Sequence, residues 1–267
     1  MTTVRCVIAS EQRQLDDALR VRWAVFGAEL GLLGAPPPAP RDVSCFDTLE
    51  TTLHFVVYAG DKAVATSRLL LPNAEVARAC GRRLGIELEQ KLDLEGVDAP
   101  GMRLAETTRY CVLNGYRGSE VLLRLQAEMY RESRRRGVTH WIASANTETD
   151  CTEDALIAFQ VAARLKCVSP DWKVTPRESA HAPQVPEAPL YTPEERLRAC
   201  QGRFEGLRLP RTLSLFARKL GARFISEPLY DARFHRYATP LVAALDAIPA
   251  STLAWFDAFP AGAARAA

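Results

Sequence analysis

The stretch LAETTRYCVLNGYRG, Leu104 to Gly118, begins as a β-strand and ends in a turn that contains glycine. It carries an acid and a base three positions apart, Glu106 and Arg109, beside the hydroxyl of Thr108. Residues three apart in a strand face opposite sides of a sheet, so the two can serve one site only if the strand bulges. Taken alone, Glu106 and Arg109 are best interpreted as an ion pair of little consequence. The alternative is that the acid accepts a proton as a base and the arginine binds an anion.

Outward from this strand, the chain alternates between strand and helix patterns. Residues 11–31 have the apolar spacing of an amphipathic helix, and the segments that flank Gly60 predict a hairpin. Further helices or strands are predicted at 119–136, 139–145, 153–166, 212–220, 222–228 and 235–245. This pattern predicts an α/β (α+β) fold with a central mixed, mostly antiparallel sheet flanked by helices.

The domain organisation predicted from the 267 residues is one domain over 1–267, which is long enough to bury a sizeable core. The proline-rich segment 169–195 is predicted to be a long loop, and loops of this length are usually functional or mobile. The alanine-rich tail, 260–267, is expected to fray.

Composition bounds the function classes. The 34 basic and 32 acidic side chains nearly cancel, so net charge favours neither a nucleic acid nor a membrane as partner. No apolar run approaches the ~20 residues that span a bilayer, and the N-terminus lacks a signal-peptide pattern. The 7 cysteines are scattered without a CxxC pair and the 4 histidines lie far apart, so we expect reduced thiols, a cytoplasmic protein and no metal site.

Several other charged side chains are individually unremarkable. Arg22, on the first predicted helix, and Arg68, within a strand, are typical of surface arginines, and Asp47 is typical of a turn. The segment YRGSEV is at most a weak phosphate loop, because one glycine precedes the helix. A basic run at the end of helix 119–136 suits the helix dipole or, alternatively, an acidic docking partner; it comprises Arg131, Arg134, Arg135 and Arg136.

Four motifs in a fixed order nevertheless resemble a known family: RVRWAVFGAELG, FDTLETTLHFVVY, AVATSRLLLP and ETTRYCV. They are similar to those of the acyl-homoserine-lactone (autoinducer) synthases and their relatives, the N-acyl amino acid synthases and the carrier-protein-dependent ornithine N-acyltransferases. The resemblance covers roughly residues 15–145. It implies a GNAT-like fold, whose central sheet has a V-shaped split, and an acyltransferase activity.

The resemblance also implies an amine-substrate pocket. Its residues would be Arg22, Phe26, Asp47, Arg68 and Thr108, together with Glu106 and Arg109. Two positions depart from the autoinducer synthases, because Leu32 stands where they usually have tryptophan and Ser44 where they have a second loop carboxylate. These departures favour an amino-acid-type acceptor over S-adenosylmethionine.

On this basis we expect an N-acyltransferase that moves an acyl chain from a carrier-protein or coenzyme A thioester to an amine. Glu106 would be the base, Arg109 would hold a carboxylate or brace the pocket, and the arginine run would dock the carrier. Backbone N–H groups would polarise the thioester carbonyl, at Cys111, Val112 and Leu113. No tightly bound cofactor is expected. The alternatives are an acyl-homoserine-lactone synthase that uses S-adenosylmethionine and a non-catalytic acyl-binding module.

Overall fold

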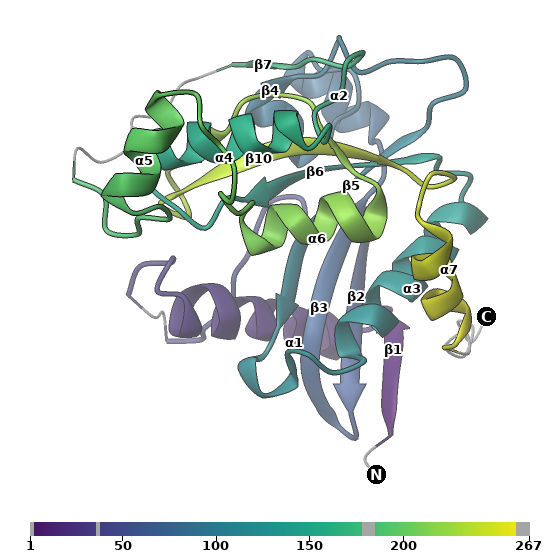
Figure 1. The fold of residues 1–267 in the computed structure, drawn as a ribbon. Helices are drawn as coiled ribbons and strands as arrows, with labels where there is room; N and C mark the ends of the chain where they lie inside the picture. Colours follow the sequence, from purple (N-terminus) through teal and green to yellow (C-terminus); the bar gives the residue numbers. More distant parts are fainter. Residues whose placement is uncertain (1–2, 36–37, 178–184, 260–267) are drawn as a thin grey trace. The chain divides into compact units, whose positions relative to one another are not determined.

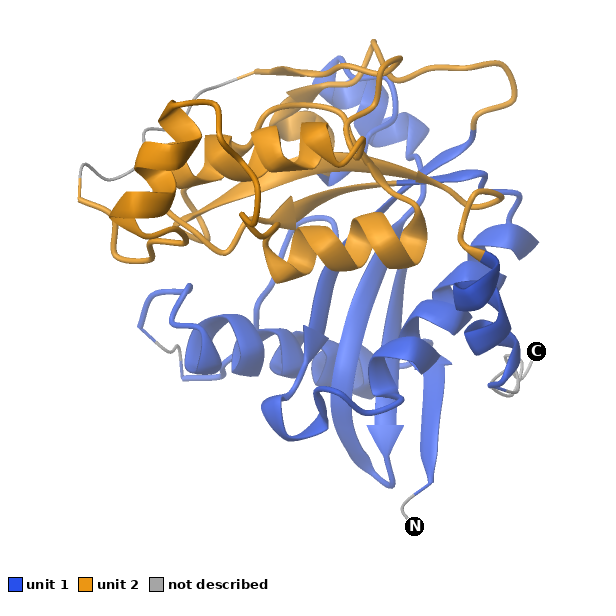
Figure 2. Cartoon of the chain, viewed as in Figure 1, with its two compact units in different colours: residues 1–87, 103–141, 250–267 blue, residues 88–102, 142–249 orange. Residues whose placement is uncertain are grey.

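The computed structural model describes residues 3–35, 38–177 and 185–259. The chain forms two compact units that interleave along the sequence (Figure 2). The first comprises residues 1–87, 103–141 and 250–267, and the second comprises 88–102 and 142–249. The single domain over 1–267 stays a prediction, and the predicted fraying of 260–267 lies outside the described residues.

The first unit is built on an antiparallel sheet (Figure 1). Its strands pair in the order β1 (Val4–Ile8), β2 (Thr52–Ala59), β3 (Lys62–Leu70) and β5 (Leu104–Val112). Strands β2 and β3 form the predicted hairpin, and Gly60 in its turn has a φ of 61°. A positive φ of this kind costs glycine little, because it has no Cβ.

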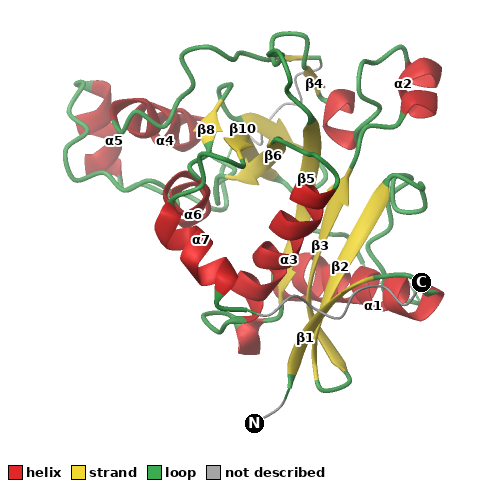
Figure 3. Cartoon of the chain, turned by 90° about the vertical axis from the view of Figure 1, so that its right-hand side faces the viewer, coloured by secondary structure: helices red, strands yellow, loops and turns green. Residues whose placement is uncertain are grey.

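Helices cover both faces of this sheet (Figure 3). On β1, Val7 packs against Ala18 of helix α1 (Gln12–Trp23). The next residue towards the N-terminus, Cys6, lies within electrostatic reach of Glu128 on helix α3 (Val121–Arg135). Because successive side chains of a strand point to opposite faces, α1 and α3 lie on opposite sides of the sheet.

The helix predicted at 11–31 has two parts. Regular α-helix ends at Trp23, and a π-helical segment, η1 (Ala24–Glu29), continues to the turn at Gly31. The carboxylate of Glu29 accepts hydrogen bonds from the N–H of Asn114, at 3.1 Å, and from the Arg117 guanidinium. Short π-segments are frequent near functional sites, and this one fastens the turn that follows β5, η3 (Asn114–Tyr116).

The second unit contains the remaining sheet. Its strands are β6 (His140–Asn146), whose first residues belong to the first unit, β10 (Arg236–Ala244) and β8 (Arg223–Phe224), with β9 (Leu229–Asp231) also on β10. A two-stranded pair, β4 (Leu92–Asp93) with β7 (Thr175–Pro176), stands apart from it. The pairs β1–β2, β2–β3, β3–β5, β8–β10, β9–β10 and β4–β7 are all antiparallel, as predicted for most of the sheet.

The proline-rich segment is fastened at its C-terminal end. Asp154, at the start of helix α4 (Thr152–Arg164), is fully buried and accepts two hydrogen bonds from Arg196, at 2.6 and 2.8 Å. It also accepts the N–H of Leu190, and Asp150 accepts the N–H groups of Glu187 and Ala188, each at 2.9 Å. The part of 169–195 from residue 187 onward is therefore anchored to α4 and is not a free loop.

The other predicted elements are present, with shifted ends. Residues 211–220 form α6 (Arg211–Leu220), but strand 222–228 shrinks to β8. Helix α2 (Ala74–Cys80) lies at the start of residues 75–99, a segment whose sequence predicts helix in places. The sequence patterns missed β1, β4, β7, β9, α5 (Pro193–Cys200) and α7 (Ala250–Asp257). Within the described ranges, none of the helices combines the length and apolarity needed to cross a bilayer.

Candidate active site

Strand β5 contains a β-bulge. In the sequence analysis, a bulge was the condition under which Glu106 and Arg109 could serve one site. Arg68 of β3 pairs with Thr108, and Thr66 pairs with Cys111, so two residues of β5 oppose Ser67 alone. The first of those two, Arg109, has a φ of 59°. A left-handed backbone is costly for a residue with a Cβ, and here it re-aims the arginine side chain.

Arg22 comes to the same region from α1. Its side chain is fully buried and donates through Nε to Asp42 and through Nη1 to Asp47, both at 2.8 Å. These two carboxylates lie in the loop before β2. The Asp47 carboxylate also accepts the N–H of Ser44, at 2.7 Å, which fixes the loop around it.

Arg68 and Arg109 extend the network through a carboxylate that the sequence did not suggest. Arg68 donates through Nη1 to Asp47, at 2.7 Å, and its Nη2 contacts Glu87 at the start of η2 (Glu87–Gln90). Arg109 donates through Nη2 to Glu87, at 3.0 Å, and its Nε lies 3.4 Å from Asp42.

These contacts close into a cycle in which arginines and carboxylates alternate. We call it the arginine–carboxylate ring; it consists of Arg22, Asp47, Arg68, Glu87, Arg109 and Asp42. Positive and negative charges are equal in number, and only Glu87 has a partly exposed side chain. A buried charge is tolerable only when it is paired, and the ring supplies each charge with two opposite neighbours.

The electrostatics of the ring follow from burial and pairing. Burial acts to raise the pKa of Asp47, but the neighbouring Arg22 and Arg68 outweigh it and hold that pKa at about 2. Burial acts to lower the pKa of Arg22, and Asp42 and Asp47 reverse the effect, so the pKa is raised. Burial lowers the pKa of Arg109, with the adjacent arginines adding to it. Asp47 and Arg22 are thus charged near neutral pH.

His54 lies beside the ring without being part of it. It faces Arg68 across the β2–β3 pair, and its Nε2 lies 2.9 Å from the backbone carbonyl of Asp47. The imidazole donates this hydrogen bond, so the proton is on Nε2. Burial lowers the pKa of His54, against the opposing influence of Asp47. The neutral histidine therefore holds the loop that carries Asp47 through this hydrogen bond.

We expect folding stability to fall with acid in two stages. Below pH 6.5 the unfolded chain protonates His54 while the folded chain resists, so stability decreases. Asp47, whose pKa falls from 3.8 to about 2 on folding, stabilises the fold fully above its unfolded pKa. Its contribution of ~2–3 kcal/mol is lost as pH falls through 4 towards 2.

Urea unfolding curves recorded from pH 7.5 to pH 3 would measure both stages. The variant His54→Gln should lose the first stage, between pH 6.5 and pH 4, and keep the second. A wild-type urea midpoint that does not change between pH 7 and pH 4 would count against the role of His54.

Glu106, the candidate base, lies on the same face of the sheet as Arg68. It pairs with Leu70 on β3, two positions beyond the Arg68–Thr108 pair, and paired residues of an antiparallel sheet point the same way. The Glu106 side chain is buried, at 4% exposure, and Thr108 is half-buried. The role of Glu106 as the base stays a prediction.

Phe26 and the end of β5 belong to an apolar cluster. Phe26 and Leu113 are half-buried and pack with Val25 and Cys111. The N–H of Leu113 donates to the carbonyl of Val64, at 3.0 Å, so this group is already used within the sheet. This N–H is therefore not available to a thioester carbonyl, and the role of Cys111 and Val112 as backbone donors stays a prediction.

The arginine run is largely paired within its own helix. Arg135 and Arg136 both donate to Glu132, and Arg131 donates to Glu128, at 2.9 Å. Arg131 also donates to the carbonyls of Phe256 and Phe259 at the end of α7, which caps that helix. Arg134 is exposed and has no ion pair among those found in the described part of the chain.

Three residues of this region were absent from the sequence-based candidates. Asp42 lies two residues before Ser44, the position at which the resemblance implied a second loop carboxylate, and its carboxylate pairs with Arg22. No local sequence motif marks Glu87 as a site residue, because the segment around it has no motif. His54 stands in a strand whose inner residues are all buried on both faces, so no alternation of polar and apolar residues marked it.

Comparisons with known proteins agree with this fold. Residues 21–127 match the family described as "Acetyltransferase (GNAT) domain". Two solved structures have the same fold. FeeM, an N-acyl amino acid synthase from uncultured soil microbes, is 11% identical with a TM-score of 0.50, covering 92% of this chain and 93% of its own. The AHL synthase LasI is also 11% identical with a TM-score of 0.50, covering 95% of each chain. No curated protein matches the sequence.

Proposed function

We propose that this chain, an acyltransferase that carries a GNAT-type acetyltransferase domain over residues 21–127, transfers an acyl group from a thioester to the amine of an amino-acid-type acceptor. The observation that carries the proposal is the position of Glu106. This buried carboxylate shares a face of β5 with the arginine–carboxylate ring, which holds the surrounding segments together.

The chemistry requires a base and a polarised carbonyl. The acceptor nitrogen forms a bond to the thioester carbon, the carbon–sulfur bond breaks, and the thiolate leaves and takes up a proton. The amine is nucleophilic only after it loses a proton, and Glu106, directly or through a water, would accept that proton. Backbone N–H groups near the bulge, at Cys111 or Val112, would stabilise the oxyanion.

We assign the ring to bracing rather than to contact with the acceptor. Asp47 is held between two arginines, and each arginine of the ring has two carboxylate neighbours, so none presents a bare charge. Of the two roles that the sequence left open for Arg22, Arg68 and Arg109, holding a carboxylate or bracing the loop, the contacts favour the second. The ring then positions Glu106 and the bulge.

A direct assay tests the proposal. The protein would be incubated with an acyl carrier protein thioester, or with acyl-coenzyme A, and a panel of amino acids, and the products identified by mass spectrometry. Formation of N-acyl amino acid with release of free thiol is expected. Thiol release with no acylated amine in any reaction of the panel would overturn the proposal.

An acyl-homoserine-lactone synthase is the second candidate, and one observation favours it. Ser44 lacks the second loop carboxylate of the autoinducer synthases, but Asp42 supplies a carboxylate to the same arginine that Asp47 contacts. Release of methylthioadenosine from S-adenosylmethionine, together with an acyl-homoserine lactone, would establish this candidate and displace the first.

If a carrier protein delivers the thioester, Arg134 is the member of the arginine run best placed to dock it, because the other three are paired. We expect Arg134→Glu to raise KM for the carrier thioester by about two- to fivefold with kcat unchanged, and to weaken the salt dependence of KM. Steady-state kinetics at low and high salt would measure this. Arg78→Glu, at an exposed arginine of α2, is the matched control; an equal change in both variants would contradict specific docking.

A further inference from the structure

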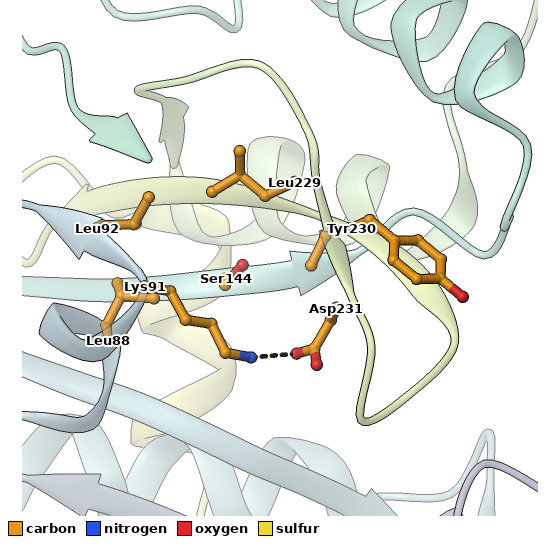
Figure 4. Close-up of a pocket in the computed structure, with 8 residues that line it drawn as sticks. Leu88, Lys91, Leu92, Ser144, Leu229, Tyr230 and Asp231 are labelled. Carbon is orange, nitrogen blue, oxygen red and sulfur yellow. Dashed lines mark hydrogen bonds and ion pairs between the residues drawn. The ribbon is translucent and has the colours of Figure 1, made fainter. Parts of the chain in front are cut away.

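A pocket in the second unit is too small to bind a substrate (Figure 4). It lies between the segment before β4 and strands β6, β9 and β10, and it has room for about one water. Its charged pair, Lys91 and Asp231, is a surface ion pair whose lysine is half-exposed, and such pairs contribute little. The backbone at the end of strand β5, in the first unit, bears more directly on the proposed chemistry.

The direction of the backbone groups at the end of β5 follows from the ladder that this strand forms with β3. The N–H of Leu113 donates to the carbonyl of Val64, at 3.0 Å, so it points towards β3. Hydrogen-bonded and non-hydrogen-bonded pairs alternate along an antiparallel ladder, and the neighbouring pair is Val112 with Ala65. The N–H and the carbonyl of Val112 therefore both point away from β3.

The ladder separates the three backbone donors that were expected from the sequence. Cys111 pairs with Thr66, two positions from the Leu113 pair, so its N–H points towards β3 as that of Leu113 does. Among these three described residues, Val112 alone directs its N–H away from the β3 ladder.

The contact that Arg117 makes agrees with this direction of Val112. Nε of Arg117 donates to the carbonyl of Val112, at 3.0 Å, from outside the ladder. The same guanidinium contacts Glu29 through Nη2, and the Glu29 carboxylate accepts the N–H of Asn114, at 3.1 Å. Glu29 and Arg117 together therefore hold the backbone on both sides of Leu113.

These backbone contacts distinguish Glu29 and Arg117 from an ordinary surface ion pair. Both side chains are partly exposed, so their mutual attraction contributes little. Arg124 and Glu120 form a similarly exposed pair, and the contacts found for that pair in the described part of the chain include no backbone group of β5. What Glu29 and Arg117 add is a fixed geometry for the peptide groups that follow the bulge.

We infer that the N–H of Val112 is the donor that stabilises the thioester oxyanion, and that Glu29 and Arg117 position it. The inference rests on the proposed function, because an oxyanion forms only when the amine attacks the thioester carbonyl. As the carbon–nitrogen bond forms, the carbonyl electron pair moves to oxygen, and it returns as the carbon–sulfur bond breaks. A donor that is held in place before the reaction stabilises this charge without reorganising. Glu29 and Arg117 act through Val112 and are positioning residues.

The variant Val112→Pro removes this N–H and spares the ladder with β3, which does not use it. We expect its kcat for acyl transfer to fall by about 100-fold or more, with KM for the thioester within about twofold of the wild type. Val112→Ala keeps the N–H and is the matched control, and the unfolding midpoints of both variants report on the fold. Equal kcat values in the two variants would overturn the inference.

The positioning role is tested by Arg117→Met, which removes the hydrogen bond to Val112. We expect kcat to fall by about tenfold with KM for the thioester unchanged, because the donor stays present but is less well aligned. Arg124→Met, which breaks the similarly exposed pair with Glu120, should keep the wild-type kcat. Equal kcat values in Arg117→Met and Arg124→Met would contradict the positioning role.

Amide hydrogen exchange measured by NMR gives a readout that does not depend on turnover. The probe is a ketone analogue of an acyl-pantetheine thioester, which has a methylene in place of the sulfur and keeps the carbonyl. It should slow exchange of the Val112 amide by at least about tenfold in the wild type and by less in Arg117→Met. The amide of Leu113, already bonded to Val64, should change little.

The exchange experiment separates the inference from the proposed function. Slower exchange at Val112 in a protein that acylates no amine would support the inference and count against the proposed function alone. Unchanged exchange at Val112 would overturn the inference, and acyl transfer by the wild type would then leave the proposed function intact.

Discussion

Replacing Asp47 with asparagine is expected to lower the free energy of unfolding by ~3–5 kcal/mol. The carboxylate lies 2.8 Å from Arg22 and 2.7 Å from Arg68, and all three side chains are almost completely buried. Asparagine keeps the shape but removes the charge, so two guanidinium groups lose a neighbour in a place that water does not reach. Domains of this kind are stable by only ~5–15 kcal/mol, so much of the variant would be unfolded in mild denaturant.

Guanidinium unfolding curves would measure the loss, and Asp16→Asn provides the control. Asp16 also pairs with an arginine, Arg41 at 2.9 Å, but both side chains are more than a quarter exposed. Exposed pairs contribute ~0–1 kcal/mol, so this variant should unfold close to the wild type. Equal losses of unfolding free energy in both variants would mean that burial does not determine how much the ion pairs of the ring stabilise the fold.

Replacing Glu106 with glutamine is expected to reduce kcat by ~100-fold or more, because an amide cannot accept the proton of the acceptor amine. The measurement is the steady-state rate of acyl transfer with the acceptor found in the product assay. KM for the acyl donor should stay near the wild-type value, since the residue acts on the amine.

Because Glu106 is buried, a structural effect must be separated from a catalytic one. The unfolding midpoint of the variant reports the first and kcat reports the second. The pH dependence of kcat gives a further readout, since loss of the base should remove the acidic limb of the profile. Near-normal turnover in Glu106→Gln would take the role of base away from this residue.

The strands and helices that pack by simple periodicity were predictable from the sequence. The hairpin β2–β3, helix α3 and helix α4 follow from apolar spacing and from Gly60 and Gly137, whose backbone φ values of 61° and 72° favour glycine. From the sequence, the bulge in β5 was predicted only as the condition under which Glu106 and Arg109 could serve one site. No residue type marks the position of such a bulge. Arg109 has a positive φ, which its residue type does not favour, and its side chain donates to Glu87.

The partners within the ring could not be predicted from local patterns. Asp42 and Glu87 are joined to arginines that lie on other elements, so only the tertiary fold brings them together. The pairing of the arginine run, by contrast, was available in the sequence, because Glu128 and Glu132 lie three or four residues before Arg131, Arg135 and Arg136 on one helix face. That spacing alone indicates ion pairs between glutamates and arginines within the helix, so the helix end does not present four free cations.

The arginine–carboxylate ring has a consequence for the rate at which the protein unfolds. Most of its hydrogen bonds join residues 19 to 25 positions apart, and they draw on five separate segments of the first unit. We expect contacts that need several segments in place to form after the transition state of folding. Substitutions in the ring should therefore accelerate unfolding and leave the folding rate almost unchanged, so that this cycle of charges governs how long a folded molecule lasts.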